Sequence, residues 1–234
     1  MHGGRCGPRP RRGSAVATLN IMPGKSDRAG FLGRTGSGKT FAATSMLRRV
    51  LPLRRLVILD SKGDDALLLP NHMLVTRLED CEQFPNSTAR VLVYRPEGAE
   101  QNRDTLDDFL QWSYDCGGFH TYVDEVTSVA TAQQLGPGFL NLLTRGRSRS
   151  RNGRRIHSPL WWATQRPAGI PVACYTESQH FYVFSLTDED DRKRVVRFTR
   201  KEFVHNPFKR YGFRYYGVID DAVMECNPLT LRAA

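Results

Sequence analysis

Short apolar runs alternate with amphipathic segments along most of this chain. The apolar runs predict strands at 29–32, 55–60, 72–76, 90–94, 118–124, 159–164 and 180–186. Segments that are compatible with an amphipathic helix lie at 39–50, 105–114, 132–143 and 188–197. Strands that alternate with helices in this way are typical of an α/β domain with a mostly parallel sheet.

The two ends of the chain depart from this pattern. Residues 1–26 are rich in Gly, Pro and Arg and contain no acidic residue, so we expect a basic, flexible N-terminal arm. Prolines and glycines oppose the amphipathic helix of a transit peptide, which argues against a targeting role. One domain is expected over 27–234, and it ends in a hairpin at 211–224 with Asp220 and Asp221 in the turn.

Composition narrows the class of protein. The 234 residues are 40% apolar and 25% charged, as in an ordinary globular domain. No apolar run reaches the roughly 18 residues of a membrane helix, so no membrane span is expected. A net charge of +10 favours a polyanionic partner such as a nucleic acid. The five cysteines form no C-x-x-C pair, which indicates a reducing, cytosolic compartment rather than a disulfide framework or a zinc site.

Residues 33–40 match the pattern G-x-x-x-x-G-K-[ST] of a phosphate-binding loop. The eight residues are Gly33, Arg34, Thr35, Gly36, Ser37, Gly38, Lys39 and Thr40. Glycines let backbone N–H groups converge on phosphates, and the following helix directs the positive end of its dipole at them. We therefore expect a nucleoside triphosphate, with Lys39 on the β- and γ-phosphates and the Thr40 hydroxyl on Mg²⁺.

Two predicted strands end in an acidic residue that could hold Mg²⁺ through its water shell. Asp60 follows the more apolar strand, whereas Asp124 is followed directly by Glu125. In the tandem pair, Asp124 can serve the metal while Glu125 polarises the water that attacks the γ-phosphorus. An activated water is unwanted in a kinase, so the pair favours hydrolysis, although an acidic exit from a strand is common in α/β domains.

The order of the motifs supports a hydrolase. Whole strand and helix units separate Thr40 from Asp124, which fits the branch of P-loop proteins with an added central strand. The strand at 159–164 ends in Gln165, and ligands of open α/β sheets gather at that edge. We interpret Gln165 as a sensor that hydrogen-bonds the γ-phosphate or the attacking water; the alternative is a glutamine that begins a surface turn.

A basic segment lies between these two strands. Six arginines fall within residues 145–155, interleaved with Ser and Gly, and predict a flexible, strongly positive loop. One of them could enter a neighbouring subunit's site and neutralise charge on the γ-phosphate, with Arg147 favoured and Arg145 second. The later arginines could contact a DNA backbone, and a merely solvated basic loop is the remaining alternative.

With these motifs assembled, the chain resembles the FtsK/HerA superfamily of ring-forming P-loop ATPases, and within it the small genome-packaging ATPases of viruses and bacteriophages. The resemblance rests on five motifs over residues 28–190: the loop, the D-x-K-G motif at 60–63, the Asp124–Glu125 pair, T-R-G-R at 144–147 and A-T-Q-R-P at 163–167. It implies an additional-strand, RecA-like P-loop NTPase fold, a three-layer sandwich over 27–234 that ends in the hairpin.

The resemblance also implies a function. Such proteins form homo-oligomeric rings, usually hexamers although a pentamer is also considered, that use ATP and Mg²⁺ to pump double-stranded DNA. The implied roles are Mg²⁺ binding for Thr40 and Asp124, catalytic base for Glu125, sensor for Gln165, and a finger supplied in trans by Arg147 or Arg145. A capsid or portal-vertex protein is the expected further partner, and the host cytoplasm and the virion are the expected locations.

Some features leave other functions open. His120 and Thr121 make the Asp124 strand less apolar than usual, so its register is uncertain. An assembly, secretion or conjugation ATPase that moves a protein or nucleoprotein is the alternative within the superfamily, although such proteins often carry a membrane segment. A small-molecule phosphotransferase would leave Glu125 without an evident role. The small size and the lack of a recognisable winged-helix module favour a viral motor.

Overall fold

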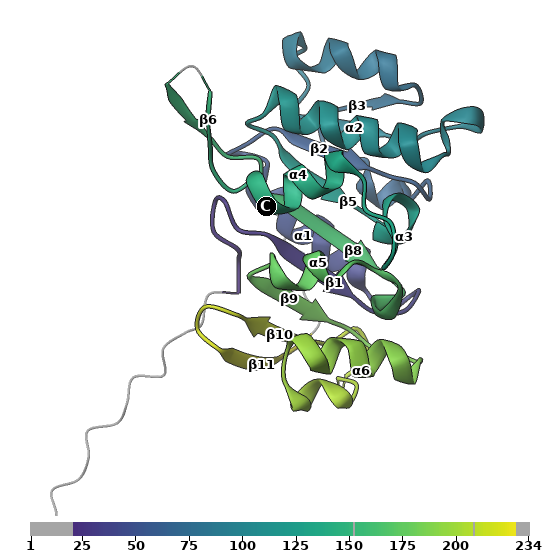
Figure 1. Cartoon of the computed structure of the whole chain (residues 1–234), viewed down its shortest axis with the longest axis vertical. Coiled ribbons are helices and arrows are strands. Elements are labelled where there is room, and N and C mark those ends of the chain that lie inside the picture. The colour runs from purple at the N-terminus through teal and green to yellow at the C-terminus, as the bar shows by residue number, and fades with distance from the viewer. Residues whose placement is uncertain (1–20, 152, 208, 228–234) are drawn as a thin grey trace, which may run out of the picture.

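A computed structural model describes residues 21–151, 153–207 and 209–227. Within these residues nine strands form one sheet in the order β11–β10–β9–β1–β8–β5–β2–β4–β3 (Figure 1). Its strands are β1 (Ala29–Leu32), β2 (Leu56–Leu59), β3 (His72–Val75), β4 (Val91–Tyr94), β5 (His120–Val123), β8 (Leu160–Thr164), β9 (His180–Val183), β10 (Phe213–Gly217) and β11 (Ala222–Cys226). Seven adjacent strands, from β9 to β3, are parallel, and β10 pairs antiparallel with both β9 and β11.

Helices cover both faces of the sheet, as Figure 1 shows. The helices are α1 (Lys39–Val50), α2 (Arg103–Cys116), α3 (Val126–Val129), α4 (Pro137–Arg145), α5 (Val172–Thr176) and α6 (Glu189–Phe198). Apolar residues of α1 pack on one face, and those of the other five helices pack on the opposite face. The central strands are buried on both faces, which explains their nearly continuous apolar sequences. The predicted three-layer sandwich with a mostly parallel sheet and a C-terminal hairpin is confirmed.

Strand β8 lies between β1 and β5, although it follows both in the sequence. It pairs parallel with each of them, so the chain inserts a strand between the one that leads into the phosphate-binding loop and the one that ends at the acidic pair. This is the added central strand that the motif spacing predicted. As a result Gln165, which follows β8, lies between the two motifs at the carboxyl edge of the sheet.

The polar residues of β5 are accommodated inside the core. Thr121 exchanges a hydrogen bond with Ser113 of α2, with the two hydroxyl oxygens 2.9 Å apart. The His120 ring meets the Trp161 ring edge-on at 4.3 Å between centroids. Burial, helped by the charge of Arg54, lowers the pKa of His120 to about 3, so the imidazole is neutral. The register of β5 is therefore regular, with Leu59 opposite Val123.

Several local predictions differ from the structure. The helix expected from residue 132 begins only at Pro137, because Gly136 and Pro137 form its start and proline suits the first helical position. The short helices α3 and α5 were not predicted. The arginine segment, expected as a flexible loop, contains an antiparallel hairpin of β6 (Arg149–Arg151) and β7 (Arg154–Ile156), in which Gly153 adopts a positive φ of 73°.

The N-terminal arm was expected to extend to residue 26, and its first twenty residues lie outside the described ones. Ile21 and Met22 are partly buried against the core cluster that includes Phe213 and Tyr215. The Tyr182 hydroxyl also donates a hydrogen bond to the Ile21 carbonyl. Residues 21–22 therefore pack with the domain rather than with the arm, because their side chains are apolar. No helix in the described ranges is long and apolar enough to span a membrane.

Candidate nucleotide-binding site

The phosphate-binding loop joins the end of β1 to the start of α1. Its first two residues anchor it: Gly33 N–H donates to the Thr164 carbonyl at 3.2 Å, and Arg34 N–H donates to the Ser185 carbonyl at 2.9 Å. Gly36 and Gly38 have φ values of 70° and 101°, which residues other than glycine rarely adopt. These two glycines turn the backbone into the helix and keep the start of α1 open to a ligand.

Lys39 lies buried in this loop, with 6% of its surface exposed. Its ammonium donates to the Arg34 carbonyl at 3.2 Å. Burial, followed by the charge of Lys62, lowers the pKa of Lys39 to about 8, while Glu125 and Asp124 act in the opposite direction. In the described structure the buried Ser37 hydroxyl has no hydrogen-bond partner, as expected for a loop that a phosphate completes.

The acidic pair lies at the carboxyl end of β5, and both side chains are buried. Asp124 accepts a hydrogen bond from the Tyr122 hydroxyl at 3.1 Å, and burial raises the pKa of its carboxyl against the opposing effect of Lys62. Glu125 begins α3 and accepts from the Thr127 N–H at 3.4 Å. The two carboxylates share Lys62, whose ammonium lies 2.9 Å from Glu125 Oε2 and 3.7 Å from Asp124 Oδ2.

The geometry distinguishes the two acids that the sequence offered for Mg²⁺. Asp60 is completely buried, and its Oδ1 accepts the N–H groups of residues 62–64 at 2.8–3.2 Å. Its Oδ2 pairs with Arg95 Nε at 2.9 Å. Both oxygens of Asp60 are therefore occupied in shaping the turn after β2. Asp124, in contrast, lines a cavity of about 420 Å³ together with Lys39 and Thr40.

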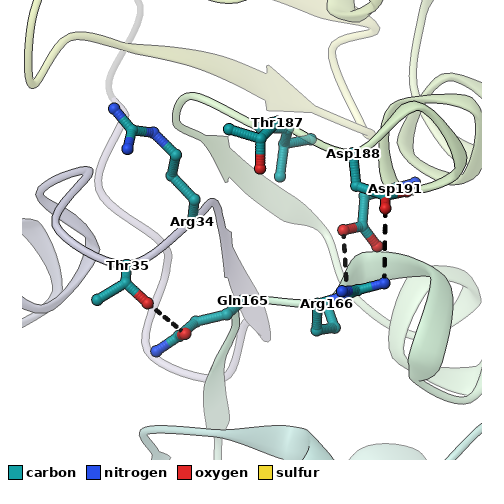
Figure 2. Close-up of a pocket in the computed structure, with 8 residues that line it drawn as sticks. Arg34, Thr35, Gln165, Arg166, Thr187, Asp188 and Asp191 are labelled. Atoms are coloured by element: carbon teal, nitrogen blue, oxygen red, sulfur yellow. Dashed lines mark hydrogen bonds and ion pairs between the residues drawn. The ribbon is translucent and has the colours of Figure 1, made fainter.

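Gln165 connects the loop to the acidic pair. Its side-chain oxygen accepts a hydrogen bond from the Thr35 hydroxyl at 2.5 Å (Figure 2). Its backbone N–H donates to Glu125 Oε2 at 3.2 Å. This backbone bond holds the Glu125 carboxylate beside the end of β8. The predicted sensor therefore contacts both the loop and the predicted base.

The next residue links this centre to α6. The Arg166 guanidinium lies 3.4 Å from the Oδ2 atom of Asp191, in the first turn of α6, and 3.6 Å from that of Asp188, the residue that caps this helix (Figure 2). Asp191 also accepts the Ala168 N–H at 2.8 Å. A second cavity of about 410 Å³ lies here and is separated from the first by the Thr35–Gln165 hydrogen bond. The segment that follows Gln165 is thus held against the start of α6 by the ion pairs of Arg166 and the hydrogen bond of Ala168.

The predicted finger residues lie elsewhere. Arg145 is the last residue of α4. The next carbonyl, that of Gly146, accepts a hydrogen bond from the Ser158 N–H at 2.7 Å. Ser158 lies two residues before the start of β8, so Arg145 and Arg147 lie near the amino end of that strand. The phosphate-binding loop follows the carboxyl end of the neighbouring parallel strand β1. Both arginines are exposed at the amino edge, so the structure does not bring them into their own nucleotide site.

Two residues of this site were given no role from the sequence. Lys62 stands in the D-x-K-G motif, and that motif was the available signal for its contact with the acidic pair. Arg95 has no comparable signal, because its contact with Asp60 joins the ends of two strands that are 35 residues apart.

The donor set of the cavity fits Mg²⁺. Hydroxyl and carboxylate oxygens are ligands that suit this ion, and Thr40 and the buried Asp124 supply them in the cavity lining. A nucleoside triphosphate suits the remaining lining, because the loop offers N–H groups and Lys39 offers positive charge.

This combination defines the class as a P-loop NTPase with an added central strand. No known protein-family model matches the sequence. The chain is similar to the DNA packaging ATPase P9 of Enterobacteria phage PRD1, with 28% identity over 183 residues that cover 76% of this chain and 72% of that protein.

Solved structures of the genome packaging NTPase B204 from Sulfolobus turreted icosahedral virus 2 share the fold. The complex with sulfate has a TM-score of 0.70 and 18% identity, and it covers 92% of this chain and 100% of that one. The complex with ATP-gammaS has a TM-score of 0.67 and 18% identity, over 88% and 98% of the two chains. The resemblance to small viral packaging ATPases, drawn from the motifs, is confirmed as a similarity in sequence and in fold.

Proposed function

We propose that this protein is an ATPase that drives the packaging of double-stranded DNA into a viral capsid. The observation that carries the proposal is the contact of Gln165 with both the phosphate-binding loop and Glu125, beside the cavity that Lys39, Thr40 and Asp124 line. The similarity to the packaging ATPase P9 supports DNA as the cargo. The net charge of +10 is consistent with a polyanionic partner.

The residues divide the reaction between them. Lys39 and the loop N–H groups hold the phosphates, and Thr40 and Asp124 hold Mg²⁺, which would neutralise charge on the β- and γ-phosphates. Glu125 orients a water molecule and accepts its proton as the water oxygen attacks the γ-phosphorus and ADP leaves. The Lys62 ammonium pairs with Glu125 Oε2 in the structure, so the proton would go to Oε1, or to Oε2 once Lys62 has moved away. Gln165 hydrogen-bonds the γ-phosphate or the water.

The assembly that we propose is a homo-oligomeric ring, a hexamer or a pentamer. Arg147, or Arg145, of one subunit reaches the γ-phosphate bound to its neighbour, and later arginines of the β6–β7 hairpin contact DNA. Arg145 and Arg147 lie at the amino edge of the sheet, away from the nucleotide site of their own subunit, which supports action in trans rather than in cis. We propose a capsid or portal-vertex protein as the further partner of the ring, and the host cytoplasm and the virion as its locations.

The test is the ATPase rate of the purified protein over a range of protein concentrations, with and without duplex DNA, at a stated low salt concentration. We expect hydrolysis that rises with protein concentration and is stimulated by DNA. Normal hydrolysis that ignores DNA would contradict the packaging function. Capture of a coat or pore protein without DNA would then favour an assembly or secretion ATPase.

Glu125→Gln tests the chemical step in the same assay. The amide cannot accept the proton from water, so turnover should fall by at least about 10²-fold while ATP binding remains. Lys39→Ala is the matched control, since it should weaken nucleotide binding itself. Hydrolysis at the original rate in Glu125→Gln would remove Glu125 as the base.

A further inference from the structure

An aromatic residue borders the nucleotide cavity on the side away from the acidic pair. Tyr211 lines the same cavity as Lys39 and Thr40, yet it comes from the segment just before β10. A methyl group added to Gly38 would lie 3.5 Å from the Tyr211 Cβ, so the tyrosine stands against the start of α1. None of the hydrolytic roles above uses this side chain.

The order of strands separates the two sides of the cavity. The loop follows β1; β8 and β5, which end at Gln165 and Asp124, lie on one side of β1, and β9 and β10 lie on the other. Thr35 contacts Gln165, whereas Gly38, three residues further along the loop, faces Tyr211. A triphosphate with its γ-phosphate near Gln165 therefore directs its other end toward Tyr211.

The backbone holds Tyr211 in this position at a cost. Its φ of 62° lies in the left-handed region, which is unfavourable for an aromatic residue. The surrounding segment is fixed by two hydrogen bonds: Asn206 Oδ1 accepts the Leu186 N–H at 2.8 Å, and Gly212 N–H donates to the Lys209 carbonyl at 2.9 Å. A strained residue held by its neighbours is a feature typical of binding sites.

The Tyr211 side chain is nevertheless exposed. Its relative exposure is 45%, and Phe41, which lines the same cavity from the first turn of α1, is 43% exposed. The Arg210 guanidinium carbon lies 4.8 Å from the centre of the Tyr211 ring, within the range of a cation–π contact. The cavity thus has two accessible aromatic side chains beyond its charged groups, and each offers a face to a flat aromatic ligand.

We propose that Tyr211, assisted by Phe41, binds the base of the nucleotide by stacking. The inference rests on the proposed function, because it assumes that the loop binds a nucleoside triphosphate. Stacking on an aromatic side chain contributes to affinity for any base, since every base has a π-face. Tyr211 is therefore a residue for affinity and placement of the nucleoside, and the phosphates are held independently by Lys39 and the loop.

The experiment compares two ligands that share their phosphates and differ in the base. Affinities for a nonhydrolysable ATP analogue and for inorganic tripolyphosphate, both with Mg²⁺, are measured by calorimetry for the wild type, Tyr211→Ala and Tyr211→Phe. We expect Tyr211→Ala to lose about 5- to 150-fold in affinity for the analogue. Its affinity for tripolyphosphate should stay within about twofold, and Tyr211→Phe should match the wild type for both ligands.

The outcomes are distinguishable. Unchanged binding of the ATP analogue by Tyr211→Ala, or an equal loss for both ligands, overturns the proposal, because the side chain then supports the loop and not the base. Retained tripolyphosphate binding also shows that the variant is folded. A wild-type protein that binds neither ligand contradicts the proposed function itself, and the assignment of Tyr211 fails with it.

Discussion

Lys39 is a charged residue in a place where water is largely excluded. Its pKa near 8 in the free protein means that the ammonium begins to lose its proton just above neutral pH. A bound triphosphate stabilises the charged form and raises that pKa. Affinity is therefore complete well below pH 8 and falls as the pH rises through that value, because binding then requires the uptake of a proton.

We expect the affinity for a nonhydrolysable ATP analogue to decrease above pH 8 by up to about tenfold per pH unit. Calorimetric titrations from pH 6.5 to 9.5 in buffers of different ionisation enthalpy would show both the decrease and the proton uptake. Lys39→Met should bind weakly with no such step. An affinity in the wild type that is constant from about pH 7 to 9.5 would contradict the assignment.

His120 is a second residue whose environment has a measurable consequence. Its pKa is 6.5 when unperturbed and about 3 in the folded protein. Between these values the unfolded chain binds a proton that the folded protein does not, so stability is lost as the pH falls. Replacement by phenylalanine keeps a ring against Trp161 and removes the titration.

The free energy of unfolding should therefore decline with falling pH more steeply in the wild type than in His120→Phe. The difference in slope approaches about 1.4 kcal/mol per pH unit between pH 6 and 4. Urea unfolding at each pH measures it, and His205→Phe, at an exposed histidine, should follow the wild type. Parallel curves for wild type and His120→Phe would show that His120 takes up its proton in the folded state.

At the scale of elements, local sequence signals account for the parts that were predicted best. The strand 29–32 and the helix 39–50 have the predicted bounds, because glycines separate an apolar run from an amphipathic one. Helix α2 begins two residues earlier than predicted, where the Asn102 side chain accepts the Thr105 N–H at 2.9 Å. A capping residue such as Asn102 can be recognised in the sequence, and recognising it corrects the predicted start of a helix by less than one turn.

The elements that were missed depend on contacts between distant residues. Arginine alternates with glycine or serine at 145–151 without apolar positions, so no apolar period indicates a strand. The hairpin instead depends on Arg149, whose guanidinium carbon lies 4.1 Å above the Tyr114 ring and whose NH2 donates to the Asp115 carbonyl at 3.1 Å. The Lys62–Glu125 ion pair joins residues 63 positions apart, so the D-x-K-G motif marked Lys62 but did not indicate its partner.

The hairpin therefore contains two kinds of arginine, and they should respond differently to substitution. Arg154 and Arg155 are exposed, so their double replacement by alanine should leave stability unchanged and weaken DNA binding. Two lost phosphate contacts reduce the slope of log affinity against log salt by about 1.8. Arg149→Ala should instead lower the melting temperature. Titrations of duplex DNA at several salt concentrations and thermal unfolding test both; an unaltered salt slope would exclude Arg154 and Arg155 as phosphate contacts.

At the scale of the molecule, the two edges of the sheet carry complementary parts. The phosphate-binding loop, Asp124 and Gln165 lie at the carboxyl edge, and Arg145 and Arg147 lie where β8 begins, at the amino edge. One subunit cannot bring these edges together. A head-to-tail contact between subunits can, and repeated contacts of that kind close into a ring when their rotation permits.

Mixed rings test this arrangement. Lys39→Ala and Arg147→Ala should each be inactive alone, yet a one-to-one mixture places an intact loop beside an intact arginine at about one quarter of the interfaces. We expect basal ATPase activity to recover toward that fraction of the wild-type rate when the subunits are dissociated, mixed and reassembled. A mixture of Lys39→Ala with Glu125→Gln is the matched control. Both of its defects belong to the same edge of one subunit, so no intact site can form and no activity should return. Recovery in both mixtures, or in neither, would mean that Arg147 does not act across the interface, and Arg145→Ala would then take its place in the same experiment.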